Sequence, residues 1–366
     1  MIFCVKCFCD PELIGTIERL GQKGNCQVCG ASNVYIYNTE INSQLSEQFD
    51  EFLDIYKPAS LLPADYPKSE FNQLKYELCY KWNIFNNIDP KIVYEIITST
   101  CNEKYQQSPD LFDSMIGIAE FYDEEYLRDK SLLRTNHWDD FVKSVKTQNR
   151  FHTNLINLSI LKRFCSFIRK SYKKGTLFYR GRISPPQGIC FEEMGAPPSD
   201  KASAGRANAP GISCLYLASD EETTIREVRA GAFDYISIGK FQLKEDIIIV
   251  DLKYIDKISP FILGLGYKEY AINKEHLIKL NNEMGKVLRK SDSDLDYVPT
   301  QYISDFIKSI EHNGEAEYAG LEYNSTMNPD GYNLAIFNPN IFECVEVNTY
   351  QIKELGYKYI RVDNKF

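Results

Sequence analysis

The sequence contains no run of roughly 18 consecutive apolar residues, the length that a membrane-spanning helix needs. Its first residues, Met1 to Lys6, offer neither the basic start nor the long apolar stretch of a secretion signal. Positive charge is also scarce, because 42 lysines and arginines face 51 aspartates and glutamates, which gives a net charge of -9. We therefore expect a cytoplasmic protein that binds neither a membrane nor nucleic acid in general.

The chain has 366 residues and is longer than one hydrophobic core usually serves. Three regions differ in composition: the first is rich in cysteine, the second has a helical pattern, and the third mixes strand and helix patterns. We predict an α+β protein with a zinc-binding ribbon at 1–38, a helical domain at 39–172 and a mixed β-sheet domain at 173–366. The sequence does not decide between a monomer and a homo-oligomer.

Eleven cysteines are present, and in a chain without an export signal clustered cysteines indicate metal rather than disulfides. Cys4-x-x-Cys7 and Cys26-x-x-Cys29 are separated by eighteen residues, a spacing typical of a four-thiolate zinc site. Cys9 is an alternative to Cys7 as the second ligand. Four sulfur ligands leave zinc no open position, so we predict a structural zinc ion.

Apolar residues recur at steps of three and four through the middle region, for example at Leu45, Phe49 and Phe52, which predicts amphipathic helices. The chain has four histidines, and two of them, His137 and His152, lie in this region. Each follows an arginine at a shorter interval than in the Arg-x4-6-His motif of HEPN ribonucleases. We expect a HEPN-like helical module whose histidines are surface or partly buried packing residues rather than a nuclease site.

The C-terminal region alternates strand patterns with helix patterns. Strands are predicted at 176–183, 212–218, 235–243, 247–252, 321–324 and 334–337, and a helix at 300–310. The segments 235–243 and 247–252 have the pattern of a strand pair that is broken at 244–246. Ser219, with Glu222 three residues later, is a capping-box signature, which predicts a helix that carries Glu227 about two turns from its start.

Short motifs follow one another in order through this region. They are Phe178-Tyr179-Arg180-Gly181-Arg182, Gly205-Arg206-Ala207-Asn208, Tyr216-Leu217-Ala218, Glu227 and Ser325. Together they resemble the RES domain family, which is named for its Arg, Glu and Ser residues, over roughly residues 175–350. The cysteine-rich start and the helical middle also look like the N-terminal arrangement of some members. One departure is the stretch 191–204, which lengthens the gap between the arginines and could form a lid or a specificity loop.

The resemblance implies a fold related to ADP-ribosyltransferases and an activity on NAD. It assigns Glu227 and Arg180 to the catalytic centre, and it places Arg180, Arg206, Tyr216 and Ser325 in contact with NAD. An ionised carboxylate would stabilise the cation that develops when the nicotinamide–ribose bond breaks, and the arginines suit the pyrophosphate. Tyr216 offers a flat ring for nicotinamide or adenine, and Ser325 offers a hydroxyl for ribose or phosphate.

Arg182 is an alternative phosphate contact, because it lies two residues from Arg180 on the same strand face. The resulting prediction is an NAD-consuming toxin or defence effector that works by hydrolysis or phosphorolysis, with NAD as substrate and zinc as a structural cofactor. Two alternatives stay open: a protein ADP-ribosyltransferase, and a zinc-containing regulatory or binding protein with an inactive RES domain. Because loss of NAD would starve the cell, we expect restraint by a cognate antitoxin or regulatory protein, or activation during phage infection.

Overall fold

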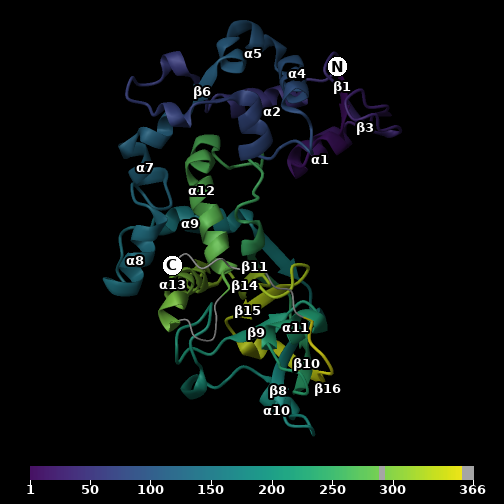
Figure 1. The fold of residues 1–366 in the computed structure, drawn as a ribbon, viewed down its shortest axis with the longest axis vertical. Coiled ribbons are helices and arrows are strands. Elements are labelled where there is room, and N and C mark those ends of the chain that lie inside the picture. The colour runs from purple at the N-terminus through teal and green to yellow at the C-terminus, as the bar shows by residue number, and fades with distance from the viewer. Residues whose placement is uncertain (288–292, 357–366) are drawn as a thin grey trace, which may run out of the picture. The chain divides into compact units, whose positions relative to one another are not determined.

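The structure, a computed structural model, describes residues 1–287 and 293–356 of the chain. The described residues form two compact units (Figure 1). One unit combines residues 1–135 with 258–274, and the other combines 136–257 with 275–356, so the division falls within helix α12 (Tyr267–Met284). None of the described helices is long and apolar enough to span a membrane.

The first unit consists of short helices and two small antiparallel sheets, in the orders β1-β3-β2 and β4-β6-β5. Its helices are α1 (Pro11–Arg19), α2 (Gln44–Leu53), α3 (Leu74–Tyr76), α4 (Pro90–Thr100), α5 (Asn102–Gln107), α6 (Asp110–Asp113) and α7 (Glu124–Lys130). Its strands are β1 (Ile2–Cys4), β2 (Lys23–Gly24), β3 (Val34–Asn38), β4 (Lys57–Pro58), β5 (Asn72–Gln73) and β6 (Met115–Gly117). The helical pattern of α2 is confirmed, because Leu45, Phe49 and Phe52 are all buried. Phe52 packs edge-on against Trp82 with ring centroids 4.9 Å apart.

The second unit is built on a mixed sheet of eight strands among the described residues, in the order β16-β10-β8-β9-β15-β14-β11-β7. Its strands are β7 (Arg169–Tyr172), β8 (Leu177–Ser184), β9 (Leu215–Ala218), β10 (Tyr235–Leu243), β11 (Ile247–Asp251), β14 (Gly320–Asn324), β15 (Tyr332–Ile336) and β16 (Phe342–Gln351), with β12 (Glu311–His312) and β13 (Glu315–Ala316) as a separate hairpin. Its helices are α8 (Trp138–Thr147), α9 (Leu158–Phe167), α10 (Phe191–Met194), α11 (Glu221–Val228) and α13 (Val298–Lys308). Only β11 and β14 pair in parallel in this part of the chain.

The eight-stranded sheet folds over on itself. β10 and β11 are joined by residues 244–246 alone, although four other strands lie between them in the sheet order. Such a link reaches about 14 Å at most, and packed sheet faces lie about 10 Å apart. The half of the sheet that contains β10 must therefore face the half that contains β11. Apolar side chains from both halves form the core between them: Phe178, Leu215, Leu217, Phe241, Leu243, Ile247, Ile249, Leu334 and Ile336.

The α+β class and the predicted C-terminal strands are confirmed, and the helix predicted at 300–310 is α13. The predicted pairing of 235–243 with 247–252 is wrong, because β10 lies between β16 and β8, whereas β11 lies between β14 and β7. The short link joins facing halves of the sheet instead of neighbouring strands. The sequence patterns also missed β7, which lies at the end of the region predicted to be helical.

Candidate functional site

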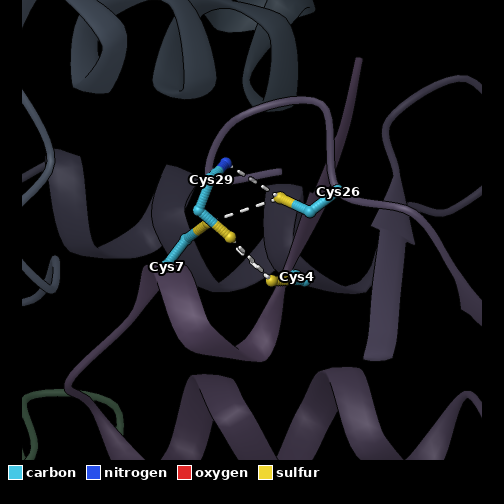
Figure 2. A group of neighbouring side chains, drawn as sticks. All are labelled: Cys4, Cys7, Cys26 and Cys29. Atoms are coloured by element: carbon cyan, nitrogen blue, oxygen red, sulfur yellow. Dashed lines mark hydrogen bonds between the residues drawn. The ribbon is translucent and has the colours of Figure 1, made fainter. Parts of the chain in front are cut away.

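Two turns in the first unit bring four cysteine side chains together (Figure 2). The Sγ atoms of Cys4, Cys7, Cys26 and Cys29 all lie within 4.8 Å of one another. The Sγ–Sγ distance is 4.0 Å for Cys4–Cys7, 3.5 Å for Cys4–Cys29 and 3.6 Å for Cys7–Cys26. Tetrahedral zinc with Zn–S bonds of about 2.3 Å requires Sγ–Sγ distances of about 3.8 Å. The cluster therefore fits a zinc ribbon and could bind zinc, whereas Cys9 is exposed and lies outside it.

The surroundings of the four sulfurs suit thiolates that share a cation. The backbone N–H groups of Val28 and Cys29 both lie 3.4 Å from Cys26 Sγ, to which they donate. Burial raises the pKa of Cys4 to about 11 and also raises the pKa of Cys7. These buried thiols therefore stay protonated at neutral pH unless a metal cation replaces the protons. A bound metal cation would stabilise the negative thiolates, which burial alone disfavours.

A second site is a cavity of about 620 Å³ in the second unit, beside the place where β8 and β9 diverge. Tyr179 and Ala218 form the one residue pair that joins these two strands in the described chain. The volume lies within the range of about 300–1,000 Å³ that is common for small-molecule sites. The cavity is lined by Tyr179, Arg180, Gly181, Arg182, Ile183, Tyr216, Leu217, Ala218, Thr224, Glu227, Val228, Tyr323 and Asn333. Three of the predicted site residues, Arg180, Tyr216 and Glu227, thus line the same cavity, together with the alternative phosphate contact Arg182.

Helix α11 carries Glu227 to the cavity. The helix begins after Asp220, whose Oδ1 accepts a hydrogen bond of 2.7 Å from the Thr223 N–H. The predicted cap at Ser219 is wrong by one residue, because the Ser219 hydroxyl donates to Asp220 Oδ2 at 2.6 Å instead. A carboxylate at this position also favours the helix through the positive end of the helix dipole. Glu227 lies in the second turn, as predicted.

Two glycines let α11 approach its neighbours closely. A Cβ on Gly181 of β8 would lie 2.7 Å from Thr224 Cγ2. A Cβ on Gly331, just before β15, would lie 2.0 Å from Thr223 Oγ1. Neither distance is possible for a real side chain, so the helix that carries Glu227 holds its place because these positions are glycine.

The Glu227 carboxylate is held through one of its two oxygens. Ser325 Oγ donates to Glu227 Oε1 at 2.6 Å, and Asn333 Nδ2 donates to the same oxygen at 2.8 Å. The Ser325 hydroxyl itself accepts from the N–H groups of Met327 (3.2 Å) and Asn328 (3.0 Å), so its proton is directed to the carboxylate. No hydrogen bond from the described residues reaches Oε2, which leaves this oxygen for a ligand.

Arg180 is a partly buried cation in the same cavity. Its Nη1 donates to the Tyr216 carbonyl at 2.9 Å, whereas its Nε is buried and has no hydrogen-bond partner. No acidic side chain in the described part of the chain forms an ion pair with it. Burial, with Arg182 nearby, lowers the pKa of Arg180 to about 10, which still leaves it charged at neutral pH. A buried charge without a counter-charge is costly, and an anionic ligand would supply the counter-charge.

Tyr216 lines the cavity, and its hydroxyl is bound by the turn 205–208. The hydroxyl donates to Asn208 Oδ1 at 2.6 Å and accepts from the Ala207 N–H at 2.9 Å. Gln301 Nε2 of α13 donates to the carbonyls of Gly205 and Asn208, both at 2.9 Å. The Gly205–Asn208 motif is therefore a turn that is fixed to the Tyr216 hydroxyl and to Gln301.

Arg206 lies in this turn but not among the residues that line the cavity. Its guanidinium donates to the carbonyls of Glu283 (3.2 Å) and Lys286 (2.7 Å) and lies 5.6 Å from the ring centroid of Tyr323. Tyr323 does line the cavity. The geometry thus gives Arg206 a supporting place behind Tyr323, and its direct contact with NAD stays a prediction.

The stretch 191–204 contacts the cavity wall through Arg182, whose Nη2 donates to the Gly195 carbonyl at 3.2 Å. Met194 is fully buried in the core of the sheet. Ser213 Oγ, close to β9, donates to the Pro197 carbonyl at 2.7 Å. These contacts anchor the stretch in the structure, and its role as a lid or specificity loop stays a prediction.

Sequence reasoning missed Asn333 and Tyr323. Asn333 interrupts the apolar run of β15 and is largely buried, and a lone amide inside a strand was the available signal. Tyr323 precedes Ser325 by two residues and faces the same side of the sheet as its partner Asn333. Both residues lie on the cavity face of neighbouring strands, which local sequence patterns cannot establish.

No curated protein and no solved structure matches the chain. A family model, that of the RES domain, matches residues 182–354. The matched stretch contains Tyr216, Glu227 and Ser325, and it begins two residues after Arg180. It lies outside residues 39–172, so the likeness of that region to HEPN modules has no support and stays a prediction. The match and the ordered motifs together support an RES domain over residues 182–354.

Proposed function

We propose that the second unit binds NAD in the cavity beside β8 and β9 and cleaves its nicotinamide–ribose bond. One observation carries the proposal: Arg180, a cation without an acidic partner among the described residues, shares the cavity with Glu227, a carboxylate held through one oxygen. A guanidinium suits a pyrophosphate, and a carboxylate suits a developing cation. RES domains are found in NAD-related toxin and effector proteins, which agrees with this substrate.

Each group has a chemical task in this proposal. When the bond breaks, its electron pair moves to the ring nitrogen, so nicotinamide leaves as a neutral molecule and the ribose becomes an oxocarbenium-like cation. Glu227, oriented by Ser325 and Asn333, stabilises this cation electrostatically. Its Oε2 is available to hold the ribose hydroxyls or to align the attacking acceptor. The ring of Tyr216 offers a flat surface for one of the two bases.

The test is a chromatographic analysis of the products that the purified full chain forms from labelled NAD, with and without inorganic phosphate. Free ADP-ribose indicates hydrolysis, and ADP-ribose 1″-phosphate indicates phosphorolysis. Label retained on a protein indicates the alternative function, a protein ADP-ribosyltransferase. If NAD remains intact under all conditions, the proposed activity is wrong. That result would favour the alternative, a regulatory or binding protein with an inactive RES domain.

Arg180→Met should separate binding from stability. We expect the variant to bind ADP-ribose at least about tenfold more weakly, because the pyrophosphate loses a charged, forked donor. Its melting temperature without ligand should equal or exceed that of the parent, because an apolar side chain of similar length replaces a buried charge that has no counter-charge. Isothermal titration with ADP-ribose and thermal unfolding measure the two effects.

The matched control for this variant is Arg226→Met on α11. Arg226 is exposed and pairs with Glu222 at 2.6 Å, so its loss should change stability by no more than about 0.5 kcal/mol and leave ADP-ribose affinity unchanged. Parental affinity in Arg180→Met would show that the guanidinium does not contact the pyrophosphate.

An enzyme that consumes NAD must be restrained in its own cell. The chain combines the RES domain with a four-cysteine cluster and a helical region, and we propose that a cognate antitoxin or another regulatory protein controls the activity. The candidate is identified by co-purification from the native source. It must suppress NAD loss when added to the pure enzyme in equimolar amount.

A further inference from the structure

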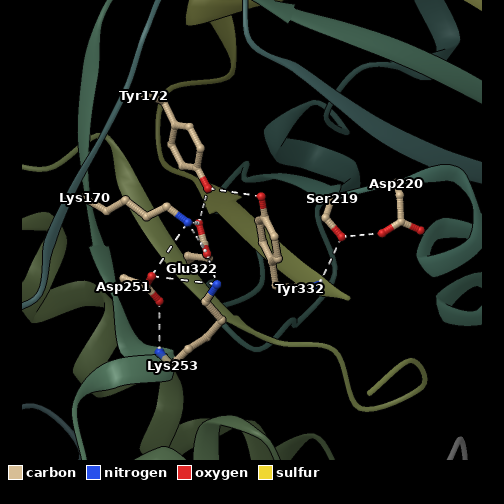
Figure 3. A network of polar contacts seen from close by, with 8 residues as sticks. All are labelled: Lys170, Tyr172, Ser219, Asp220, Asp251, Lys253, Glu322 and Tyr332. Carbon is tan, nitrogen blue, oxygen red and sulfur yellow. Dashed lines mark hydrogen bonds and ion pairs between the residues drawn. The ribbon is translucent and has the colours of Figure 1, made fainter. Parts of the chain in front are cut away.

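A buried ion cluster lies in the second unit (Figure 3). Its centre is Glu322 of β14, whose side chain is fully buried. Lys170 of β7 pairs with Glu322 at 2.8 Å, Lys253 pairs with it as well, and the Tyr172 hydroxyl donates to its Oε2 at 2.5 Å. Asp251 lies 3.8 Å from the ammonium group of each lysine. Burial and the nearby Glu322 raise the pKa of Asp251 to about 6.

The cluster faces the sheet side opposite to the cavity. Glu322 pairs with Leu334, a residue of the core, whereas its neighbour Tyr323 pairs with Asn333 and lines the cavity with it. Because side chains alternate along a strand, a shift of β14 or β15 by one residue would turn Tyr323 and Asn333 away from the cavity. Such a shift would also separate the buried Glu322 from its two lysines, and a buried charge left without its partner is strongly destabilising.

Tyr332 connects the cluster to the start of α11 (Figure 3). The Lys253 ammonium lies 4.0 Å from the centroid of the Tyr332 ring, and the Tyr172 and Tyr332 hydroxyls are 3.4 Å apart. The Tyr332 N–H donates to Ser219 Oγ at 3.2 Å, and its carbonyl accepts from the Ser219 N–H at 2.9 Å. Ser219 in turn bonds Asp220, the N-cap of α11.

The strand that carries Tyr332 and the helix that Asp220 caps also meet at the proposed catalytic carboxylate, Glu227. Asn333 follows Tyr332 directly, Glu227 lies in α11, and these two side chains are joined by the 2.8 Å hydrogen bond described above. The cluster, Tyr332 and Ser219 thus hold both elements that supply this hydrogen bond. We propose that Glu322 and Ser219 are positioning residues for Glu227, an inference that rests on the proposed NAD-cleaving function.

Glu322→Gln tests the proposal because it keeps the side-chain shape and removes the charge that both lysines share. We expect kcat for nicotinamide release to fall about tenfold with little change in KM, because Glu227 would be held less well in position. A loss of this size is typical of residues that are coupled through one network. Asn333→Ala should also lower kcat. In the double variant the losses should not multiply, because both changes disturb the same carboxylate. Losses that multiply would mean that Glu322 supports only general stability, and the proposal would fail.

Hydrogen exchange gives a readout that does not need activity. Glu322→Gln should speed amide exchange in residues 219–228 and 325–333 before the rest of the second unit is affected. If the parent protein does not cleave NAD, the proposed function fails while this measurement still decides whether the cluster positions α11. Unchanged exchange in these two segments would overturn the proposal.

Two further variants complete the test, one as a substitute for Glu322→Gln and one as its control. Ser219→Ala removes the opposite end of the connection without touching the buried charges, so it should reproduce the lower kcat and the faster exchange if Glu322→Gln does not fold. Glu346→Gln is the matched control, because Lys240 and Glu346 form an exposed 3.0 Å ion pair between β10 and β16 of the same sheet. Its kcat and exchange should equal those of the parent, and a loss as large as that of Glu322→Gln would contradict the specific role of the cluster.

Discussion

Glu227→Gln is expected to lower the rate of nicotinamide release from NAD by about 10²–10³-fold, the usual cost of removing an electrostatic stabiliser of a transition state. Glutamine keeps the oxygen that accepts from Ser325 and Asn333, so the side chain should stay in place while its charge is lost. The cation on ribose develops only as the bond breaks. The effect should therefore appear in kcat, with KM almost unchanged. Initial rates over a range of NAD concentrations measure both constants.

Glu222→Gln provides the control on the same helix. Glu222 is exposed and pairs with Arg226 one turn further along, at a distance of 2.6 Å. Its replacement removes an equal charge from α11 without touching the cavity, so kcat should stay within about twofold of the parent value. If Glu227→Gln is as active as Glu222→Gln, the carboxylate has no part in bond cleavage and the proposed site is wrong.

The features predictable from sequence are those that depend on nearby residues. The Cys-x-x-Cys spacing sets the ligand register because each pair sits on one short turn, and the cluster has Cys7 rather than Cys9 in it. The strands β8 to β11 follow from runs of apolar and β-branched residues. The sequence predicts the start of α11 one residue too early, since Ser219 and Asp220 are both good capping residues and only the backbone decides between them.

What could not be predicted depends on contacts between distant segments. β10 and β11 look like a hairpin in sequence, and only the core between the two halves of the sheet explains why they separate. Asn333 and Glu227 are 106 residues apart, so no local pattern announces their hydrogen bond. The partners of Arg206 could not be predicted either, because its guanidinium donates to the carbonyls of Glu283 and Lys286, about 80 residues further along the chain.

Cys7→Ser is expected to abolish tight zinc binding and to unfold the N-terminal ribbon. Structural zinc in small four-ligand sites contributes an apparent free energy of about 10–16 kcal/mol, which exceeds what a segment of this size gains from its own core. The parent should release about one zinc ion per chain to a chromogenic chelator under denaturing conditions, and the variant should release almost none. Amide exchange in residues 1–38 should become fast in the variant.

Cys9→Ser is the matched control for this experiment, because Cys9 is an exposed cysteine two residues away that lies outside the cluster. It should keep both the zinc and the slow exchange. The ribbon also contacts the rest of the first unit, since the Cys9 N–H donates to the Ile84 carbonyl at 2.7 Å and the Cys7 carbonyl accepts from the Asn86 N–H at 2.9 Å. Faster exchange at residues 84–86 should therefore accompany metal loss. A Cys7→Ser variant that keeps one zinc ion would show that another ligand set binds the metal.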